Sequence, residues 1–595
     1  MAQNTNIFSD RIAQVRSLGY DAVIVSGTDP HSSEYVAPRW KQVEWLSGFT
    51  GETGDLVVTQ DHAGLWTDTR YFIQATQQLA GTGIELHKTR VSDAVLIPQW
   101  LSGHFRNKPV RIAFDGLCQS VASIRELDEA LREAYGLGGY ELIDIPDMLD
   151  KLWAGRPAIP HTPVTAFDEK IAGETRKEKI AWLRGEMQKT GCRSMFLTSL
   201  DEIAWLLNVR GNDIEYNPYV ISFLLVTPQQ VVWFVRHVEE VPGIRDITTA
   251  DYAVLEDALE DLHDECGRLF IDASTLNYHT CKLIRKFFTD SEIRFGTSPV
   301  VLRKAIKNKK EIEGFRRACI EEGVAMETFL YWLETSVQGG ARITEWEAAE
   351  KLASLRAQSG DFHGNSFETI SAYGSSAALP HYSTPRENSP VIQPRGLYLV
   401  DSGGQYAFGT TDITRTVPMG RCSRLEREDY TLVLKGMIDL TLAVFPEGTA
   451  GCQIDALARR PLWAAQRNFG HGTGHGVGFC LGVHEGPQSI RQDFNPQALR
   501  PGMVMSNEPG IYREGKHGVR HENIVLCREE GKSAFGTFLG FETLSCCHIE
   551  SSVVIKKLLN KSERRWLKAY NRVVYRMLKN RLAPEVAKWL RKKCR

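Results

Sequence analysis

Length, composition and charge already exclude several classes of protein. The chain has 595 residues, of which 42% are hydrophobic and 24% are charged, and its formal net charge at pH 7 is −2. So long a chain exceeds a single hydrophobic core and predicts two to four domains. A dedicated nucleic-acid-binding protein normally carries a strong basic excess. We therefore expect no nucleic-acid partner.

Targeting and redox signals favour a cytoplasmic protein. Residues 1–20 lack the apolar segment of a secretory signal, and no stretch approaches the roughly 18 apolar residues of a membrane span. The 12 cysteines are scattered without a Cys-x-x-Cys pair, and only Cys546 and Cys547 are adjacent. This pattern is typical of reduced thiols. We expect a cytoplasmic chain with no membrane partner.

The first predicted elements occur twice in chain order. A helix over 9–18 is ended by Gly19 and followed by an apolar strand over 22–26. A second helix over 176–190 is ended by Gly191 and followed by a strand over 194–199. Each copy then passes an aspartate and a Trp-Leu pair before a glycine turn: Asp29, Trp45 and Leu46 in the first, and Asp201, Trp205 and Leu206 in the second. The repetition predicts two related α/β domains.

A proline-rich stretch and a change of pattern indicate the domain boundaries. Residues 156–163, RPAIPHTP, predict a linker because proline disfavours helix and central strand. An amphipathic helix over 307–334 opens a region of alternating helices and strands. A last helix over 562–579 has Ser562 as its expected N-cap. We predict domains over 1–155, 156–298 and 299–555, and a helical extension over 556–595.

Five side chains with metal-binding chemistry follow one another in the last third of the chain. They are Asp401 and Asp412 in DSGGQYAFGTTDITRT, His475 in HGTGHGVG, Glu508 in NEPG and Glu522 in VRHEN. Four carboxylates and one imidazole are too many for one ion. They suit two divalent cations that share bridging carboxylates and a bridging water or hydroxide. Such a centre indicates a hydrolase.

The patterns around these residues favour strands and glycine turns. Asp401 follows the apolar stretch GLYLV and Asp412 lies among β-branched residues, so two strands of a hairpin or meander could present both carboxylates on one side. The glycines of HGTGHGVG disfavour helix and permit close backbone approach. Taken singly, each residue also fits an ordinary role in a turn, loop or core. Together and in this order, they favour a metal centre.

Other catalytic motifs are absent from the sequence. There is no HExxH zinc motif and no GxSxG nucleophile elbow. GTGHGVG lacks the GxGxxG spacing of a dinucleotide-binding loop. The GKS at 531–533 would need glycine at 526 to form a phosphate-binding loop, and Leu526 stands there. The dinuclear hydrolase therefore remains the working hypothesis.

The motifs resemble those of the dinuclear metallopeptidases with the pita-bread fold, which include methionine aminopeptidase, prolidase and aminopeptidase P. The resemblance is strongest to aminopeptidase P (Xaa-Pro aminopeptidase). It rests on four motifs: ALPHY at 378–382, DSGGQYAFGTTDITRT, HGTGHGVG with VHEGP, and NEPGIY. Residues 201–218 and 563–571 resemble parts of its long, three-domain cytosolic form. The resemblance implies an α+β fold class, with a C-terminal pita-bread catalytic domain preceded by two related α/β domains.

The resemblance also implies which residue holds which metal ion. Asp401 would bind one ion, and His475 with Glu508 would bind the other. Asp412 and Glu522 would bridge the pair. Mn²⁺ is the usual ion in this branch, and an oxygen-rich site with one imidazole suits it. The spacing of the residues alone does not decide between Mn²⁺, Co²⁺ and Zn²⁺.

Further residues match positions around the metal centre of the family. His381, His471 and His484 match histidines that bind substrate and carry protons. Arg520 and Tyr512 match positions that support the metal-bound aspartate through a hydrogen-bonded chain. Ordinary packing on a strand and in a loop would explain Arg520 and Tyr512 equally well.

The implied activity is release of the first residue from peptides with proline in the second position. The bond before proline is a tertiary amide without an N–H. A metal-bridging hydroxide would attack the carbonyl carbon, while His381 or His484 would stabilise the oxyanion. Glu508 would transfer the proton to the proline nitrogen. The family also implies a homodimer that acts on a peptide substrate.

Two alternative functions stay open. A prolidase would use the same chemistry on Xaa-Pro dipeptides only. A metal-free pita-bread domain would serve as a binding scaffold, although such relatives lack the ligands that this chain retains. The sequence departs from the family at His521, at Cys546–Cys547 and in the acidic GETG at 51–54. We expect His521 to face away from Glu522 because strand neighbours point to opposite faces. The preferred first residue of the substrate is not determined.

Overall fold

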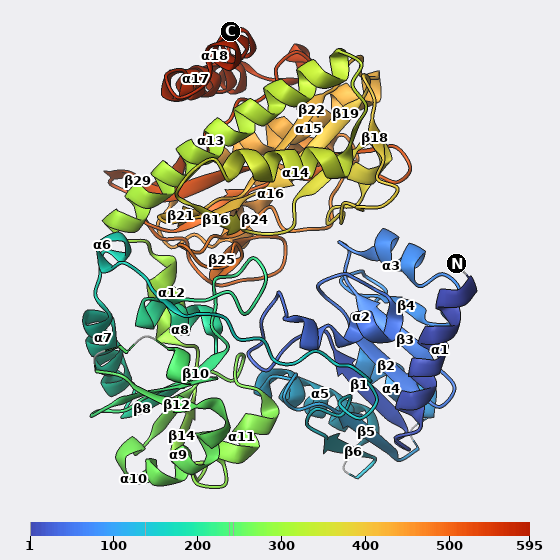
Figure 1. Cartoon of the computed structure of the whole chain (residues 1–595), viewed down its shortest axis with the longest axis vertical. Coiled ribbons are helices and arrows are strands. Elements are labelled where there is room, and N and C mark those ends of the chain that lie inside the picture. The colour runs from blue at the N-terminus through green and yellow to red at the C-terminus, as the bar shows by residue number, and fades with distance from the viewer. Residues whose placement is uncertain (1, 107, 137, 237, 242, 245) are drawn as a thin grey trace. The chain divides into compact units, whose positions relative to one another are not determined.

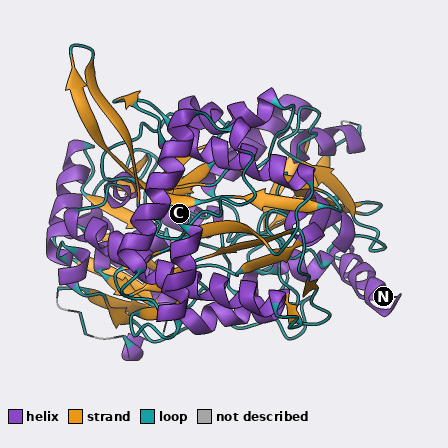
Figure 2. Ribbon diagram, turned by 90° about the horizontal axis from the view of Figure 1, so that it is seen from above, coloured by secondary structure: helices purple, strands orange, loops and turns teal. Residues whose placement is uncertain are grey.

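The computed structural model describes residues 2–106, 108–136, 138–236, 238–241, 243–244 and 246–595. The chain forms two compact units (Figure 1). The first comprises residues 1–169 and 174–300, and the second comprises 170–173 and 301–595. Helices and strands are both present throughout the chain (Figure 2). The finer boundaries at 155, 298 and 555 stay predictions.

The first sheet of the N-terminal unit has six strands in the order β4-β3-β2-β1-β5-β6. Its strands are β1 (Ala22–Ser26), β2 (Asp55–Thr59), β3 (Ala63–Thr67), β4 (Glu85–Lys88), β5 (Val110–Phe114) and β6 (Tyr140–Asp144). β1 pairs antiparallel with β2 and parallel with β5, and β2 pairs antiparallel with β3. The outer pairs β3–β4 and β5–β6 are parallel. β1 covers the predicted residues 22–26.

The second sheet of this unit repeats that pattern with the order β12-β11-β10-β8-β13-β14. Its strands are β8 (Ser194–Leu197), β10 (Ser222–Val226), β11 (Val231–Val235), β12 (Thr248–Asp251), β13 (Leu269–Ile271) and β14 (Ile293–Phe295). β8 pairs antiparallel with β10 and parallel with β13, and β11–β12 and β13–β14 are parallel. Each pairing has its counterpart in the first sheet. The prediction of two related α/β domains is confirmed.

The helices of the N-terminal unit repeat as well. They include α1 (Ala2–Arg16), α2 (Gln42–Ser47), α3 (Phe72–Gln78), α4 (Ile97–Phe105), α5 (Val121–Tyr135), α7 (Arg176–Lys189), α8 (Leu200–Leu207), α9 (Leu255–Asp261) and α11 (Tyr278–Ile284). The turns after α1 and α7 reach Gly19 and Gly191 at φ +77° and +72°, a conformation that glycine adopts without strain. Both Trp-Leu pairs lie on a short helix, α2 or α8. α1 begins earlier than the predicted residue 9.

Four helices surround the sheets of the C-terminal unit. They are α13 (Lys309–Gln338), α14 (Glu345–Arg356), α15 (Arg424–Thr441) and α16 (Gly451–Ala464). α13 starts at a capping box in which Asn308 accepts from the Glu311 N–H and Glu311 accepts from the Asn308 N–H. This cap explains why the helix begins at Lys309 rather than at the predicted residue 307.

The sheets of the C-terminal unit bring distant segments side by side. A three-stranded sheet joins β17 (Ile370–Tyr373), β19 (Leu397–Ser402) and β22 (Ile413–Pro418). A six-stranded sheet has the order β23 (Phe445–Pro446), β30 (Gly536–Thr543), β29 (Asn523–Ser533), β26 (Val504–Asn507), β24 (Gly474–Gly476) and β25 (Glu485–Ile490). α13 and α14 cover β19 and β22 in one apolar core (Figure 1). That core fixes the strands that carry the first predicted ligands.

The chain ends in two helices that pack on the C-terminal unit, α17 (Lys561–Leu578) and α18 (Pro584–Lys593). The prediction of Ser562 as the N-cap of α17 is wrong. Asn560 caps the helix, because its side chain accepts from the Glu563 N–H and Glu563 completes a capping box. Ser562 instead donates to Asn560 Oδ1 at 2.7 Å.

Two features bear on the predictions from composition. All 12 cysteines are free thiols, and Cys546 and Cys547 are both buried. Over the described part of the chain, no helix combines the length and apolar character needed to cross a lipid bilayer.

Candidate metal centre

Asp401 and Asp412 are brought together by an antiparallel strand pair. β19 and β22 are in register with Asp401 opposite Thr414, and Asp412 lies just before β22 begins at Ile413. Both aspartates are buried. The charge of Asp412 contributes to raising the pKa of Asp401, so the two carboxylates lie close together.

Arg520 holds one oxygen of Asp401 and leaves the other without a partner. Arg520 Nε donates to Asp401 Oδ2 at 3.1 Å, and Nη2 donates to the same oxygen. Asp401 Oδ1 is buried and makes no hydrogen bond. A buried, unpaired carboxylate oxygen is costly. It is the kind of atom that a cation would satisfy.

The Nε2 atom of His475 faces two carboxylates. It lies on β24, and its Nδ1 is 2.9 Å from the Gly476 carbonyl oxygen, to which it can only donate. In the neutral ring, Nε2 then carries the lone pair that can bind a metal ion. That nitrogen lies 3.3 Å from Asp412 Oδ2 and 3.4 Å from Glu508 Oε1. With a neutral His475 ring, these three electron-rich groups repel one another unless a cation lies among them.

Glu522 joins the cluster from the turn before β29. Its N–H donates to the Thr414 carbonyl at 3.2 Å, and Thr414 Oγ1 donates to Glu522 Oε2 at 2.8 Å. Glu522 Oε1 is buried without a hydrogen bond. Strand β29 begins at Asn523, directly after Glu522. Glu522 is therefore fixed by one oxygen and exposes the other to the cluster, as Asp401 does.

The electrostatics show that all four carboxylates share one site. Ligand atoms of Asp412, His475 and Glu522 lie within 4.8 Å of one another. Burial raises the pKa of Glu508 to about 7, and the charges of Asp412 and Asp401 add to this while His475 opposes it. Burial and the neighbouring carboxylates raise the pKa of Glu522 well above its usual value. Burial also raises the pKa of Asp401, against the charge of Arg520. Carboxylates gathered in one poorly solvated site repel one another, and cations bound among them would offset that repulsion.

A hydrogen-bonded chain connects His471 to the same site. His471 Nε2 and the Tyr512 hydroxyl are 2.7 Å apart, and Arg520 Nη1 donates to that hydroxyl at 2.7 Å. His471 Nδ1 lies 2.7 Å from the Gly472 carbonyl oxygen. Burial and the charge of Arg520 lower the pKa of His471 well below its usual value. His471 is therefore neutral and accepts the proton of Tyr512.

The remaining predicted histidines occupy different surroundings. The His484 ring lies edge-on to the His475 ring, with 4.4 Å between centroids. His381 follows the short helix η4 (Gly374–Ala378), and its charge contributes to lowering the pKa of His471. His521 is buried and packs edge-on against Tyr430 of α15, at 4.3 Å between centroids. Burial lowers the pKa of His521 to about 3. Its ring thus lies in the core beside α15.

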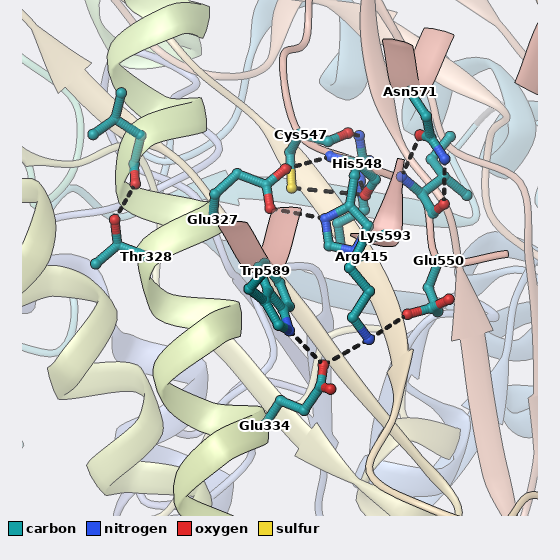
Figure 3. A network of polar contacts seen from close by, with 12 residues as sticks. Glu327, Thr328, Glu334, Arg415, Cys547, His548, Glu550, Asn571, Trp589 and Lys593 are labelled. Carbon is teal, nitrogen blue, oxygen red and sulfur yellow. Dashed lines mark hydrogen bonds and ion pairs between the residues drawn. The ribbon is translucent and has the colours of Figure 1, made fainter. Parts of the chain in front are cut away.

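Two residues that the sequence interpretation did not single out support the cluster. Thr414 lies opposite Asp401, donates to Glu522 Oε2, and accepts a hydrogen bond from Arg520 Nε at 3.2 Å. Arg415 Nη1 donates to the Glu522 carbonyl at 2.5 Å, and Nη2 donates to the Cys547 carbonyl at 2.7 Å. Arg415 thereby ties Glu522 to the C-terminal segment shown in Figure 3. Thr414 could have been predicted from its position two residues after Asp412, since alternate strand residues share a face. No local pattern in the sequence identified Arg415.

Family models match nearly the whole chain. Residues 313–529 match the model of metallopeptidase family M24, and residues 537–595 match the C-terminal region of that peptidase. Residues 11–152 and 155–311 each match the creatinase/prolidase N-terminal domain. A protein of Fusarium vanettenii named probable Xaa-Pro aminopeptidase P is 40% identical over 571 residues, covering 92% of this chain and 91% of the relative.

The chain belongs to metallopeptidase family M24. A second relative in this family, from Laccaria bicolor and also named probable Xaa-Pro aminopeptidase P, is 36% identical over 605 residues and covers 98% of this chain and 93% of its own length. The fold prediction, a pita-bread domain after two related domains, is confirmed.

Two solved structures differ in how much of this chain they match. The crystal structure of X-prolyl aminopeptidase from Caenorhabditis elegans, described as a cytosolic enzyme with a dinuclear active site, has a TM-score of 0.93 at 33% identity and covers 99% of both chains. An Xaa-Pro dipeptidase from Bacillus anthracis has a TM-score of 0.51 at 25% identity and covers 63% of this chain and 99% of its own. The likeness to the aminopeptidase extends over the whole architecture.

Proposed function

We propose that this chain is a dinuclear metal-dependent aminopeptidase that releases the N-terminal residue from peptides with proline in the second position. The observation that carries the proposal is the convergence of His475 and four carboxylates. Three of these, Asp401, Asp412 and Glu522, are buried, and Asp401 and Glu522 each have an oxygen without a hydrogen bond. Similarity over nearly the full length to proteins named for Xaa-Pro aminopeptidase activity supports the substrate class.

The five side chains would divide between two divalent cations. Asp401 would hold one ion, His475 and Glu508 the other, and Asp412 with Glu522 would bridge them. Hard carboxylate oxygens with one imidazole favour Mn²⁺. When bound, such ions lower the pKa of a water molecule and polarise a carbonyl oxygen. The like charges of the four carboxylates repel one another, and bound cations would offset that repulsion.

The residues of the chain would then handle the substrate and its protons. The Glu508 carboxylate would accept a proton from the attacking water and release it to the proline nitrogen, which must be protonated to leave. His381 and His484 would donate hydrogen bonds to the carbonyl oxygen as negative charge develops there. His471, held by Tyr512, would border the proline ring. Because the scissile amide has no N–H, this arrangement needs no acceptor at that nitrogen.

A prolidase restricted to dipeptides is the main alternative. It would use the same five ligands, so the cluster itself does not separate the two activities. The dipeptidase structure covers 63% of this chain, whereas the C. elegans aminopeptidase covers 99%. This difference in coverage favours the aminopeptidase.

Peptide hydrolysis tests the proposal directly. The full chain, loaded with Mn²⁺, is incubated with matched Xaa-Pro-Pro, Xaa-Ala-Pro and Xaa-Pro peptides, with and without a chelator. We expect release of the first residue from Xaa-Pro-Pro only, and loss of that activity with the chelator. Preferred cleavage of Xaa-Pro would support a prolidase. Binding of peptides without cleavage, in a fully folded chain that retains no metal, would support a scaffold.

We further propose that the chain forms a homodimer and acts in the cytoplasm. Both points rest on the family resemblance and on the cytosolic description of the C. elegans relative. Sedimentation of the purified chain tests the first point, and fractionation of the source cells tests the second.

A further inference from the structure

A cluster of histidines and carboxylates lies at the outer edge of the first N-terminal sheet, in the unit that does not hold the candidate metal centre. His62 lies in the turn between β2 and β3, Glu85 and His87 lie on the edge strand β4, and His104 lies on α4 (Figure 1). His62 and His104 are largely buried, with 18% and 22% of their side chains exposed, while Glu85 is 67% exposed. The cluster is therefore within reach of solvent but not freely mobile.

The strand geometry aims three of these side chains at one point. Glu85 and His87 are two residues apart on β4 and share a face of the sheet. β4 pairs with β3 so that Glu85 lies opposite Gly64. A Cβ at Gly64 would lie 2.7 Å from Nε2 of both His62 and His87, so the two rings meet above this glycine. The absence of a side chain at residue 64 creates the space that both imidazoles fill.

The distances fit donors of a single ion. The Nε2 atoms of His62 and His87 are 3.2 Å apart. Two imidazoles on one tetrahedral Zn²⁺, with Zn–N of about 2.0–2.1 Å, have their nitrogens about 3.3 Å apart. One donor atom from each of His62, Glu85 and His87 lies within 4.8 Å of the other two. A fourth position would be open to water or another side chain.

Aromatic packing fixes the orientation of the rings. Trp66 stacks on His87 with 3.8 Å between centroids and 3° between planes. Trp100 of α4 lies 4.5 Å from the His62 ring and stacks on His104 at 4.6 Å. Burial lowers the pKa of both His62 and His87, so both rings are neutral near pH 7. Neutral imidazole is the form that binds metal.

We propose that His62, Glu85 and His87 bind one divalent transition-metal ion of the Zn²⁺, Ni²⁺ or Cu²⁺ class. Two imidazoles and one carboxylate favour these borderline cations, whereas the carboxylate-rich cluster of the C-terminal unit favours Mn²⁺. The competing explanation is a metal-free relay in which His87 donates to His62 and His62 donates to Glu85, since His62 Nδ1 is 3.8 Å from Glu85 Oε2. A separation of 3.8 Å is too long for a hydrogen bond, and it leaves that relay incomplete.

Metal content of the Mn²⁺-loaded full chain tests the site. After dialysis against limiting Zn²⁺, we expect the double variant His62→Gln/His87→Gln to retain one zinc fewer per chain than the parent, with its manganese content and peptide turnover unchanged. The matched control is His263→Gln, because that ring also lies between two carboxylates, Asp264 and Glu292. Equal zinc content in the parent and the double variant would overturn the proposal.

Two further measurements test the metal site even if the double variant misfolds. Glu85→Gln changes a largely exposed side chain that should not disturb the fold, and we expect it to weaken Zn²⁺ binding at least tenfold. Cu²⁺ substituted at this site should show an electron paramagnetic resonance spectrum with two equatorial nitrogen ligands in the parent, lost in His87→Gln. Unchanged affinity in Glu85→Gln together with a copper spectrum lacking nitrogen couplings would support the metal-free relay.

Discussion

Arg520 Nη1 donates a 2.7 Å hydrogen bond to the hydroxyl of Tyr512. The same guanidinium holds Asp401, and the hydroxyl in turn reaches His471 at 2.7 Å. One arginine therefore couples a proposed metal ligand to a proposed substrate-binding histidine. Partners that orient ligands in this way commonly matter almost as much as the ligands themselves.

Removing the Tyr512 hydroxyl should impair turnover without unfolding the chain. We expect Tyr512→Phe to lower kcat by roughly 10- to 100-fold, because Arg520 and His471 lose their common partner. Steady-state kinetics with an Xaa-Pro-Pro peptide would measure the loss, and thermal unfolding should change little. Tyr373→Phe is the control, since the Tyr373 hydroxyl donates to a backbone carbonyl, that of Arg395, at 2.8 Å. Equal kcat in the two variants would refute the coupling.

Neutralising Asp412 should empty the metal centre. Asp412→Asn removes one of four clustered negative charges and a proposed bridge, so we expect turnover to be abolished and bound manganese to fall while the chain stays folded. Mass spectrometry of bound metal and circular dichroism would check both parts. Asp493→Asn serves as the control, because the Asp493 side chain is 61% exposed and pairs with Arg491. Full turnover of Asp412→Asn in saturating Mn²⁺ would contradict the ligand assignment.

The loop between Asp401 and Asp412 leaves no space for a side chain at Gly403. A Cβ at Gly403 would lie 1.9 Å from the Thr411 carbonyl oxygen. The backbone would have to move, so we expect Gly403→Ala to cost about 3 kcal/mol of unfolding free energy and to displace Asp401 from Asp412. Urea unfolding measures the cost. Gly360→Ala meets nothing within 4 Å and should be nearly neutral. Equal stability of the two variants would show that the loop can adjust freely.

The Lys593–Glu550 ion pair should make the stability of the chain depend on pH. Burial alone would raise the pKa of Glu550, but it is lowered from 4.5 to about 2, mainly by the Lys593 ammonium 2.7 Å away (Figure 3) and also by the charge of His548 and the Ser552 N–H. Because the folded pKa lies below the unfolded value, the stabilisation is complete above pH 4.5 and is lost as pH falls toward 2. The shift corresponds to roughly 3 kcal/mol at neutral pH.

Lys593→Met should therefore lower the unfolding free energy by roughly 3 kcal/mol at pH 7 and by clearly less at pH 3. Urea unfolding of the metal-free chain at both values provides the measurement. Lys588→Met changes an exposed lysine of the same helix and should alter stability little at either pH. A deficit of Lys593→Met that is the same at both pH values would exclude the ion pair as its cause.

Local chemistry made part of the fold predictable. Gly19 and Gly191 ended their helices because the chain turns there into a left-handed conformation, and β1 spans the predicted residues. The N-cap of α17 was missed even though its signal was present. Asn560 stands three residues before Glu563, the spacing of a capping box, whereas Ser562 has no such partner. Asn560 rather than Ser562 caps the helix because only Asn560 has a glutamate, Glu563, at the capping-box position.

The sequence by itself determined which side chains have metal-binding chemistry, and their order along the chain identified them as one set. It could not determine how they meet, because Asp401 and Glu522 are brought together by hydrogen bonds across strands rather than by neighbouring residues. Only the tertiary structure showed Arg415 joining Glu522 to the C-terminal segment, and His62 meeting His87 above Gly64. Such contacts depend on pairing, register and burial over long stretches of chain, and no local pattern of residues specifies them.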